Sequence, residues 1–129
     1  RVGVLAHAGG RGEPAARGWL GAALGMAAGE VPLQRDGHGR PRLALPGRDC
    51  NWSHSGDRLL VALAQGAQVG VDVEIARPRP KALEIARRYF HAAEAAALAA
   101  LPADARDQAF LRLWCAKEAV LKAHGRGLA

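Results

Sequence analysis

The sequence has 129 residues, of which half are hydrophobic and 23% are charged. This length suits one domain or two small subdomains that share a core, and the composition is that of a globular protein, not a disordered one. The net charge is +6 and the pI is about 10.3, so we expect acidic partners. Gly, Arg and Glu interrupt every apolar stretch, and none approaches the ~20 residues of a membrane span.

The two cysteines and the N-terminal residues indicate the cellular compartment of the protein. Cys50 and Cys115 lie far apart in dissimilar contexts, so we expect free thiols, although a disulfide between them stays open. No CxxC spacing suggests zinc. Residues 1–7 are too short and too polar for a signal peptide. We therefore expect a reduced, cytoplasmic protein that does not associate with a membrane.

The first part of the chain predicts one strand and one helix. Alternating apolar residues predict a short strand over 1–7. Apolar residues at helical spacing predict a helix over 15–28 that ends at Gly29. Residues 35–50 are rich in Gly, Pro and Arg, which predicts a loop with at most short extended pieces.

The rest of the chain predicts two strands followed by helices. The strands are expected at 58–64 and 69–75, joined by a turn over 65–68. Three helices follow, at about 81–90, 92–100 and 105–123, the last with Asp104 as its N-cap and Gly125 after its end. This order of elements predicts the α+β class.

The predicted strand at 69–75 carries two acids on one face. Its β-branched residues alternate with Gly70, Asp72 and Glu74, so the two carboxylates project together with Cα atoms roughly 7 Å apart. Carboxylates at that separation can converge on one hard cation, and Gly70 leaves room for a ligand beside them. An ordinary half-buried strand with a solvated acidic face is the alternative from this stretch alone.

Residues 53–57 predict a polar turn that enters the strand at 58. Ser53, His54 and Ser55 would place hydroxyls, backbone N–H groups and an imidazole at one point, which suits an anion. Serines that only cap backbone groups are the alternative. The sequence has no GxSxG-like elbow, so it gives little support to hydrolase chemistry.

The last predicted helix carries a carboxylate and an ammonium one turn apart. Glu118 and Lys122 share the stripe of Trp114 and therefore border the core. A surface ion pair would contribute only about a few tenths of a kcal/mol. The other interpretation is a metal ligand or proton acceptor beside a phosphate clamp. Lys117 points about a quarter-turn away, and its interpretations as a phosphate clamp or as a solvated charge stay equally open.

Together and in this order, these stretches resemble the 4'-phosphopantetheinyl transferases of the Sfp type. That family has an Asn-x-Ser-His-Ser turn, a Gly-hydrophobic-Asp-hydrophobic-Glu strand and a Trp-x-x-Lys-Glu-Ala-x-x-Lys-x-x-Gly-x-Gly-Leu helix. The matching stretches are Asn51–Ser55, Gly70–Glu74 and Trp114–Leu128, with further similarity at Gly39-Arg40-Pro41 and at Arg88-Tyr89-Phe90 with Glu94. The resemblance runs from about residue 19 to the end. About seventy residues precede Asp72, which favours the Sfp type over the shorter holo-acyl-carrier-protein synthases.

The resemblance implies a fold of two similar α/β halves related by a pseudo-twofold axis. The halves would be 1–68 and 69–129, and the second is expected to be truncated because its closing strands are missing. The basic N-terminal segment that helps the family to hold coenzyme A is also expected to be short or absent. Trp52 and Arg40 replace an aliphatic residue and a lysine of the family pattern.

The resemblance also implies a reaction and its residues. Phosphopantetheine would pass from coenzyme A to a serine of an acidic carrier protein. Asp72, Glu74 and Glu118 would hold Mg²⁺, Glu118 would accept the serine proton, and Lys122 would contact the pyrophosphate. The predicted contacts to coenzyme A are Arg35, Arg40, Ser53, His54, Lys117 and Lys122, with His54 at the 3'-phosphate. We expect a monomer that binds neither nucleic acid nor membrane.

Two other functional classes fit parts of the sequence. A Mg²⁺-dependent nuclease or phosphodiesterase could use the same three acids and a lysine, but Ala76 stands where the usual Asp…Glu-x-Lys pattern needs lysine. A non-catalytic basic module for nucleic acid would place aromatic residues among the basic ones, and the stretch from Arg35 to Arg48 has none.

Overall fold

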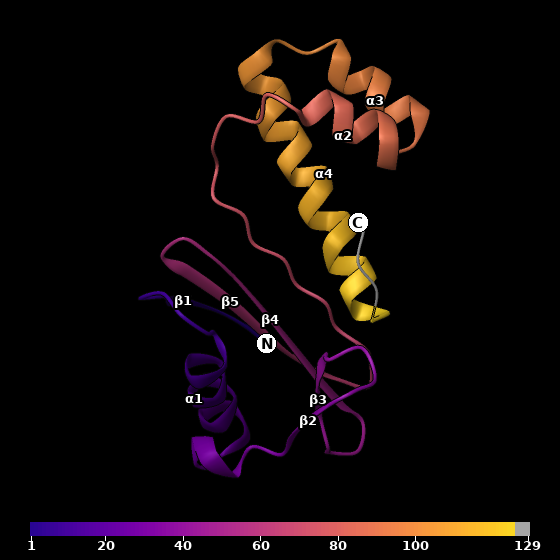
Figure 1. Ribbon diagram of the computed structural model, residues 1–129. Helices are drawn as coiled ribbons and strands as arrows, with labels where there is room; N and C mark the ends of the chain where they lie inside the picture. The colour runs from indigo at the N-terminus through magenta and orange to yellow at the C-terminus, as the bar shows by residue number, and fades with distance from the viewer. Residues whose placement is uncertain (126–129) are drawn as a thin grey trace.

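The computed structural model of the protein describes residues 1–125 (Figure 1). In chain order the elements are β1 (Val2–Ala6), α1 (Glu13–Leu24), the 3₁₀ helix η1 (Ala28–Glu30), β2 (Leu33–Arg35), β3 (Pro41–Leu43), β4 (Arg48–Ser55), β5 (Arg58–Gln65), α2 (Ala82–Tyr89), α3 (Ala92–Ala99) and α4 (Ala103–Ala123). The predicted α+β class is confirmed. Within the described range, no helix combines the length and apolar character needed to cross a membrane. The pseudo-twofold relation, the truncation and the division after residue 68 stay predictions.

One antiparallel sheet has the strand order β1-β5-β4, and β2 and β3 form a separate hairpin. Helix α1 covers one face of the sheet, where Leu20, Cys50 and Val61 are fully buried. Neighbouring strand residues point to opposite faces, so Asn51 and Ser53 project away from α1. Cys50 and Cys115 are free thiols, as the sequence predicted.

Two predictions for the first part of the chain need correction. Helix α1 begins at Glu13 and ends at Gly25, four residues before the predicted stop, because Gly25 adopts a left-handed conformation (φ 72°) in which its N–H bonds the carbonyl of Gly21. Residues 35–50 contain the three-residue β3, which fits the predicted loop with short extended pieces, but they also contain the start of the eight-residue β4, which the prediction missed. Their polar side chains find long-range partners, which composition alone does not reveal.

The strand at 58–64 is confirmed as β5, but the predicted hairpin with 69–75 is wrong. β5 pairs with β1 and β4 instead. Residues 69–75 are not a strand of either sheet, although alternate backbone N–H groups of this segment do find partners. We call residues 69–75 the acidic segment.

The three predicted helices are confirmed as α2, α3 and α4, and they pack around a second apolar cluster. The ring of Phe110 stacks on Phe90 and Trp114, with centroids 5.5 Å and 6.0 Å apart. The predicted N-cap of α4, Asp104, lies inside the first turn, because the helix begins after Pro102. The part of the predicted C-terminal motif beyond Gly125 lies outside the described residues.

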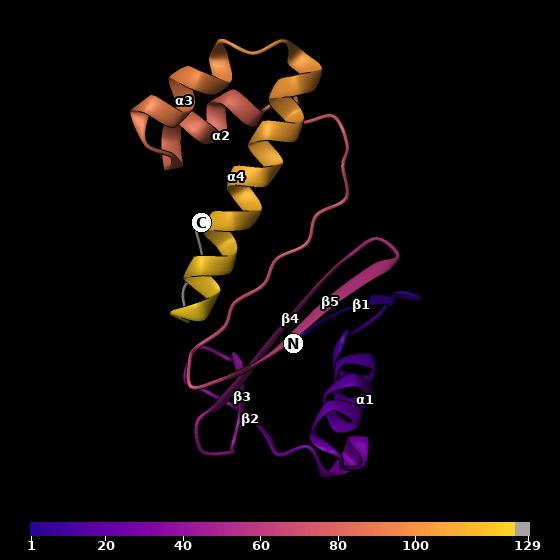
Figure 2. The ribbon, with the colours of Figure 1, turned by 180° about the vertical axis from the view of Figure 1, so that it is seen from behind.

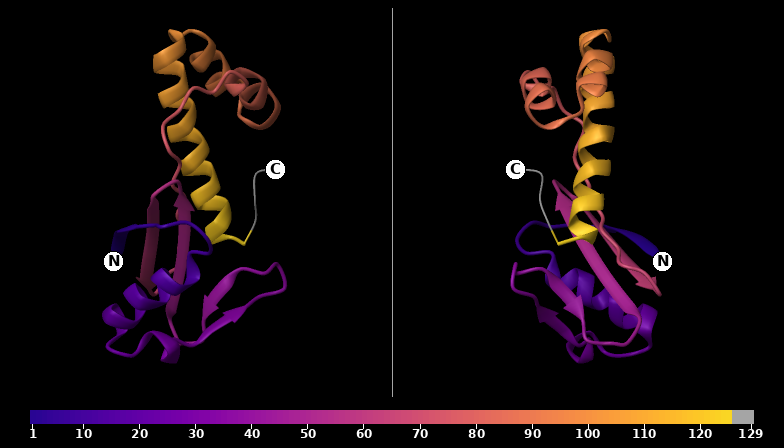
Figure 3. Two further views of the ribbon diagram at one scale, coloured as in Figure 1. Left: turned by 60° about the vertical axis from the view of Figure 1, so that its left-hand side comes forward. Right: turned by 90° about the vertical axis from the view of Figure 1, so that its right-hand side faces the viewer.

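The two clusters are joined by residues 66–81, which run as a long coil from β5 to α2 beside α4 (Figure 2). The C-terminal end of α4 comes down toward the sheet, on the side opposite α1 (Figure 3). The acidic segment belongs to this coil and therefore lies where the two parts of the molecule meet.

Candidate functional site

The acidic segment is held along β4 by side chains instead of by a backbone ladder. The N–H groups of Val69, Val71, Val73 and Ile75 donate to side-chain oxygens of Asp49, Asn51, Ser53 and Ser55, at 2.8, 2.8, 3.3 and 3.1 Å respectively. Each donor comes 20 residues after its acceptor, so the segment runs parallel to β4. The acceptors are alternate residues of β4 and therefore share the face away from α1.

Helix α4 packs on the other side of the acidic segment. Gly70 lies so close to the helix that a Cβ there would overlap the carbonyl of Ala119 and the N–H of Ala123. The predicted room for a ligand beside Gly70 is therefore filled by the backbone of α4. Lys122 reaches back from the helix, and its Nζ donates to the carbonyl of Val71 at 3.0 Å.

Asp72 lies at the centre of this contact. Its side chain is only 11% exposed, and its Oδ1 accepts from Ser53 Oγ at 3.2 Å and lies 3.5 Å from Lys122 Nζ. Within residues 1–125, the buried Oδ2 has no hydrogen-bond partner. A buried carboxylate oxygen without a nitrogen or oxygen donor is costly, so Oδ2 is suited to bind a cation, with the Cys115 thiol as the nearby weak donor of the chain itself.

The other two predicted metal ligands come from different elements, the acidic segment and α4. Glu74 pairs with Arg79, with Nη2 and Oε2 3.3 Å apart, and Glu118 lies on α4 one turn before Lys122. Among the described residues, no group of three or more His, Cys, Asp or Glu side chains is arranged to hold a metal ion. The assignment of Asp72, Glu74 and Glu118 as one ligand set therefore stays a prediction.

Cys115 is a neighbour of the acids that the sequence did not single out. Burial of its thiol raises the pKa of Cys115 to about 11, with further contributions from the charge of Asp72, a hydrogen bond to the Asp72 carboxyl and the charge of Glu74. The thiol therefore stays protonated at neutral pH. Cys115 precedes Glu118 by three residues and Lys122 by seven, so helical spacing alone would have placed it on their face.

The Ser-His-Ser stretch is the end of strand β4 and not a turn. Only residues 56–57 turn between β4 and β5. Because the strand alternates, Ser53 faces the acidic segment, whereas the His54 ring lies beside the ring of His7, with centroids 4.4 Å apart. Ser53 and His54 therefore do not form a single anion pocket.

The basic residues predicted to bind phosphate have partners of their own. Arg40 is buried, pairs with both oxygens of Asp49 at 3.3 Å and also donates to the carbonyl of Val69. Arg35 lies 2.7 Å from Glu13. Lys117 lies 2.8 Å from Glu94, so the solvated interpretation of Lys117 is replaced by a specific ion pair.

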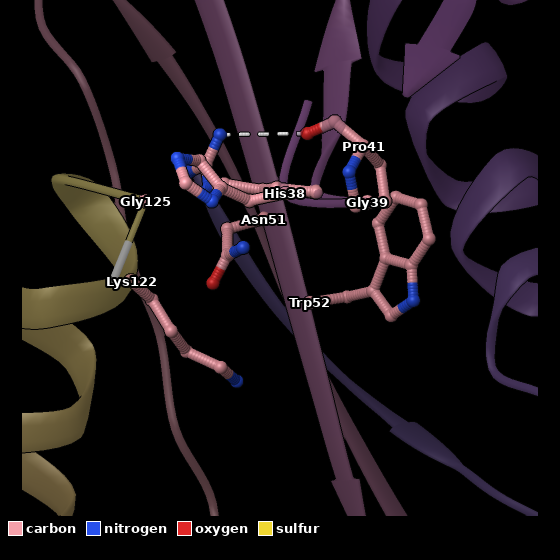
Figure 4. A pocket seen from close by; sticks show the side chains of 8 residues that line it. His38, Gly39, Pro41, Asn51, Trp52, Lys122 and Gly125 are labelled. Carbon is pink, nitrogen blue, oxygen red and sulfur yellow. Dashed lines mark hydrogen bonds between the residues drawn. The ribbon is translucent and has the colours of Figure 1, made fainter. Parts of the chain in front are cut away.

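A pocket of about 530 Å³ opens beside the Lys122 ammonium (Figure 4). In Figure 4, Asn51 lies on the side of Lys122 and the end of α4, and Trp52 lies on the side of Gly39 and Pro41 of the β2–β3 hairpin. Its lining residues are His38, Gly39, Arg40, Pro41, Asn51, Trp52, Lys122 and Gly125. The structure thus brings Arg40 and Lys122 to one pocket, whose lining does not include Asp72, Glu74, Glu118 or His54.

Comparison with known proteins gives consistent matches. Residues 68–129 match the family model described as the 4'-phosphopantetheinyl transferase superfamily. The 4'-phosphopantetheinyl transferase HetI of Nostoc is 37% identical over 117 residues, which are 88% of this chain and 49% of that relative. The 4'-phosphopantetheinyl transferase Sfp of Bacillus subtilis is 33% identical over 100 residues, which are 77% of this chain and 43% of Sfp.

A third relative, the 4'-phosphopantetheinyl transferase AcpT of Escherichia coli, is 37% identical over 75 residues, which are 58% of this chain and 38% of AcpT. The chain thus spans about half the length, or less, of these curated relatives. The matched region includes the acidic segment and the Lys-Glu-Ala helix, the two elements that meet at Asp72 and Lys122. On these sequence matches, the chain belongs to the 4'-phosphopantetheinyl transferase superfamily.

Proposed function

We propose that the protein transfers 4'-phosphopantetheine from coenzyme A to a serine of an apo carrier protein. The observation that carries this proposal is the Lys122 ammonium, which lies beside a carboxylate with an unpartnered oxygen and also lines an open pocket. Such a neighbourhood combines a cation site with an anion contact, which the reaction needs for the pyrophosphate of coenzyme A. Membership of the family supports the same reaction.

The metal ligands in this proposal are Asp72, Glu74 and Glu118. Their carboxylates supply the oxygen donors that Mg²⁺ prefers, and the unpartnered Oδ2 of Asp72 supports its inclusion. Glu74 would exchange its contact with Arg79 for the metal. When bound, Mg²⁺ offsets the charge of the pyrophosphate.

The chain's own residues then perform the transfer. The serine hydroxyl attacks the phosphorus that carries pantetheine, the bond from this phosphorus to the bridging oxygen breaks, and 3',5'-adenosine bisphosphate leaves. Glu118 takes the serine proton. Lys122 stabilises the negative charge that develops on the leaving phosphate.

The remaining predicted contacts would bind the nucleotide part of coenzyme A. We assign Arg40 and Lys122 to the pocket, and His54 to the 3'-phosphate. Arg35, Ser53 and Lys117 are further candidates, and Arg35 and Lys117 would each exchange an ion pair for a phosphate. The net charge of +6 favours an acidic carrier protein as the partner. We propose a cytoplasmic monomer that binds neither nucleic acid nor membrane.

The test compares Glu118→Gln with Lys122→Ala. The purified protein is incubated with an apo carrier protein, coenzyme A and Mg²⁺, and the mass gain of one phosphopantetheine is followed over time. We expect each variant to lose at least about a hundredfold in turnover, since each group supplies a few kcal/mol of transition-state stabilisation. Only Glu118→Gln should also weaken the response to Mg²⁺.

Matched controls come from the start of helix α2, where the N-cap residue Lys81 and Glu84 are exposed. Glu84→Gln and Lys81→Ala should transfer at the wild-type rate. If Glu118→Gln and Lys122→Ala also keep near-normal rates, these two residues do not act in the transfer. If the wild-type protein gives no mass gain on any apo carrier tested, the proposed function is wrong.

A further inference from the structure

The contacts of the acidic segment point to residues that act on the reaction without touching a substrate. The segment depends on β4 side chains for its alternate backbone N–H groups. Alternate side chains of a strand and alternate N–H groups of an extended chain have the same period of two residues. Four alternate side chains of β4 can therefore each serve one N–H group of the segment, which fixes its register.

Asn51 serves the part of the segment that meets Lys122. Its buried side chain accepts the N–H of Val71 at 2.8 Å, and the carbonyl of the same Val71 accepts Lys122 Nζ at 3.0 Å. The backbone of Val71 is thus held from β4 at one end and from α4 at the other. Asp72 follows directly, so the position of its carboxylate depends on this arrangement.

Ser53 holds the other side of Asp72. Its Oγ donates to Asp72 Oδ1 at 3.2 Å and accepts the N–H of Val73 at 3.3 Å. The hydroxyl therefore fixes one carboxylate oxygen, while Oδ2 of the same carboxylate has no partner among the described residues. Both bonds of Ser53 are used inside the protein, which leaves little capacity for a phosphate.

We propose that Asn51 and Ser53 are positioning residues, whose side chains place the Asp72 carboxylate beside Lys122 by holding the acidic segment against β4. The expected effect on the rate of transfer rests on the proposed function, because it assumes that Asp72 and Lys122 take part in the reaction. A positioning role replaces the candidate role of Ser53 as a contact to coenzyme A, because both hydrogen bonds of its hydroxyl are made inside the protein. Small displacements of catalytic groups can cost up to about a hundredfold in rate.

The structural arm of the test is amide hydrogen exchange in the purified protein. Asn51→Leu removes the acceptor at similar size, Asn51→Asp keeps an oxygen acceptor, and Ser53→Ala removes only one oxygen atom. We expect Asn51→Leu to lower the protection of the Val71 and Val73 N–H groups at least tenfold, and Asn51→Asp to retain most of it. Gln65→Leu is the matched control, a polar-to-apolar change at an exposed position of β5, and should leave both groups protected.

The kinetic arm separates positioning from ligand binding. Ser53→Ala should lower kcat about tenfold while KM for coenzyme A changes less than twofold. Asn51 also lines the pocket, so its positioning role is tested by the hydrogen-exchange arm and not by KM. The affinity of Ser53→Ala for 3',5'-adenosine bisphosphate in EDTA should stay within twofold of wild type. A large loss of this affinity with an unchanged kcat would make Ser53 a ligand contact and overturn its assignment.

The two arms also separate this proposal from the proposed function. Unchanged exchange at Val71 and Val73 in Asn51→Leu and in Ser53→Ala would overturn the positioning proposal whatever the activity. Ser53→Ala is a small change, so it provides this result even where Asn51→Leu fails to fold. Lost protection in a protein without transferase activity would refute the proposed function and support only the structural part of the proposal.

Discussion

At the scale of single residues, the role of a polar side chain in this structure follows from the partner it contacts, which is often far away in the sequence. Lys117 illustrates this, because its ammonium lies 2.8 Å from Glu94 and 5.0 Å from the centre of the Phe90 ring. The hydrogen bond from Lys117, together with that from the backbone N–H of His91, lowers the pKa of Glu94 below its ordinary 4.5. Lys117 thus joins α4 to the start of α3 in this structure.

Lys117→Met is expected to raise the pKa of Glu94 toward 4.5, because the largest cause of the lowering is removed. A carbon-detected NMR titration of the Glu94 carboxyl measures this directly. Because the folded pKa is lowered, the contact stabilises the fold above the unfolded pKa, and this contribution is lost as pH falls below about 4.5 through the folded value. An unchanged Glu94 titration in Lys117→Met would contradict the ion pair. Lys81→Met is the matched control.

At the scale of elements, the decisive contact is between the acidic segment and α4. Gly70 lacks a side chain where the helix backbone passes, and this allows Lys122 to reach the Val71 carbonyl. The same approach explains why a glycine precedes the acids, a role that alternation along a strand did not reveal. The buried Arg40–Asp49 pair supports the contact from the hairpin side, since Asp49 Oδ2 also accepts the N–H of Val69.

Gly70→Ala is expected to destabilise the protein by about 1–3 kcal/mol, because the added Cβ meets backbone atoms of α4 that have little freedom to move. Urea unfolding followed by circular dichroism measures the change. Gly18→Ala is the control, because a Cβ at this exposed helical position meets nothing within 4 Å. The control should be neutral or stabilising by up to about 1 kcal/mol. Equal stabilities of both variants would show that α4 does not pack on Gly70.

At the scale of the whole molecule, two apolar clusters are joined mainly by polar contacts. One lies between the sheet and α1 and contains Leu20, and the other lies among α2, α3 and α4 and contains Phe110. Among residues 1–125, none belongs to both clusters. The bonds of the acidic segment to β4 and to Lys122 therefore carry much of the coupling between the two parts.

We expect the two clusters to respond separately to mutation. Leu20→Ala should destabilise the first by about 2–5 kcal/mol and Phe110→Ala the second by about 3–5 kcal/mol, because each leaves a cavity. Trp19 and Trp52 report on the first cluster and Trp114 on the second, so single-tryptophan variants follow each part during denaturant unfolding. Equal shifts of both fluorescence transitions in each variant would show one cooperative unit instead.

The sequence by itself determined the α+β class, the strands β1 and β5, the three C-terminal helices and the motif residues, because periods of 2.0 and 3.6 residues are local properties. It also placed Asp72 and Glu74 on one face of the segment. It did not reveal the role of the polar residues at every second position of β4, Asp49, Asn51, Ser53 and Ser55. This alternation is visible in the sequence, but it does not say which segment these side chains bind.

Only the tertiary structure decided what that partner is. Val71 meets an acceptor 20 residues earlier and a donor 51 residues later, and no local pattern specifies contacts at such separations. The same holds for the contact of the His54 ring with His7, and for Arg40 in its buried pair with Asp49. A polar side chain can bond a ligand, water or the chain itself, and the packing of α4 and β4 around the acidic segment determines which partner it has.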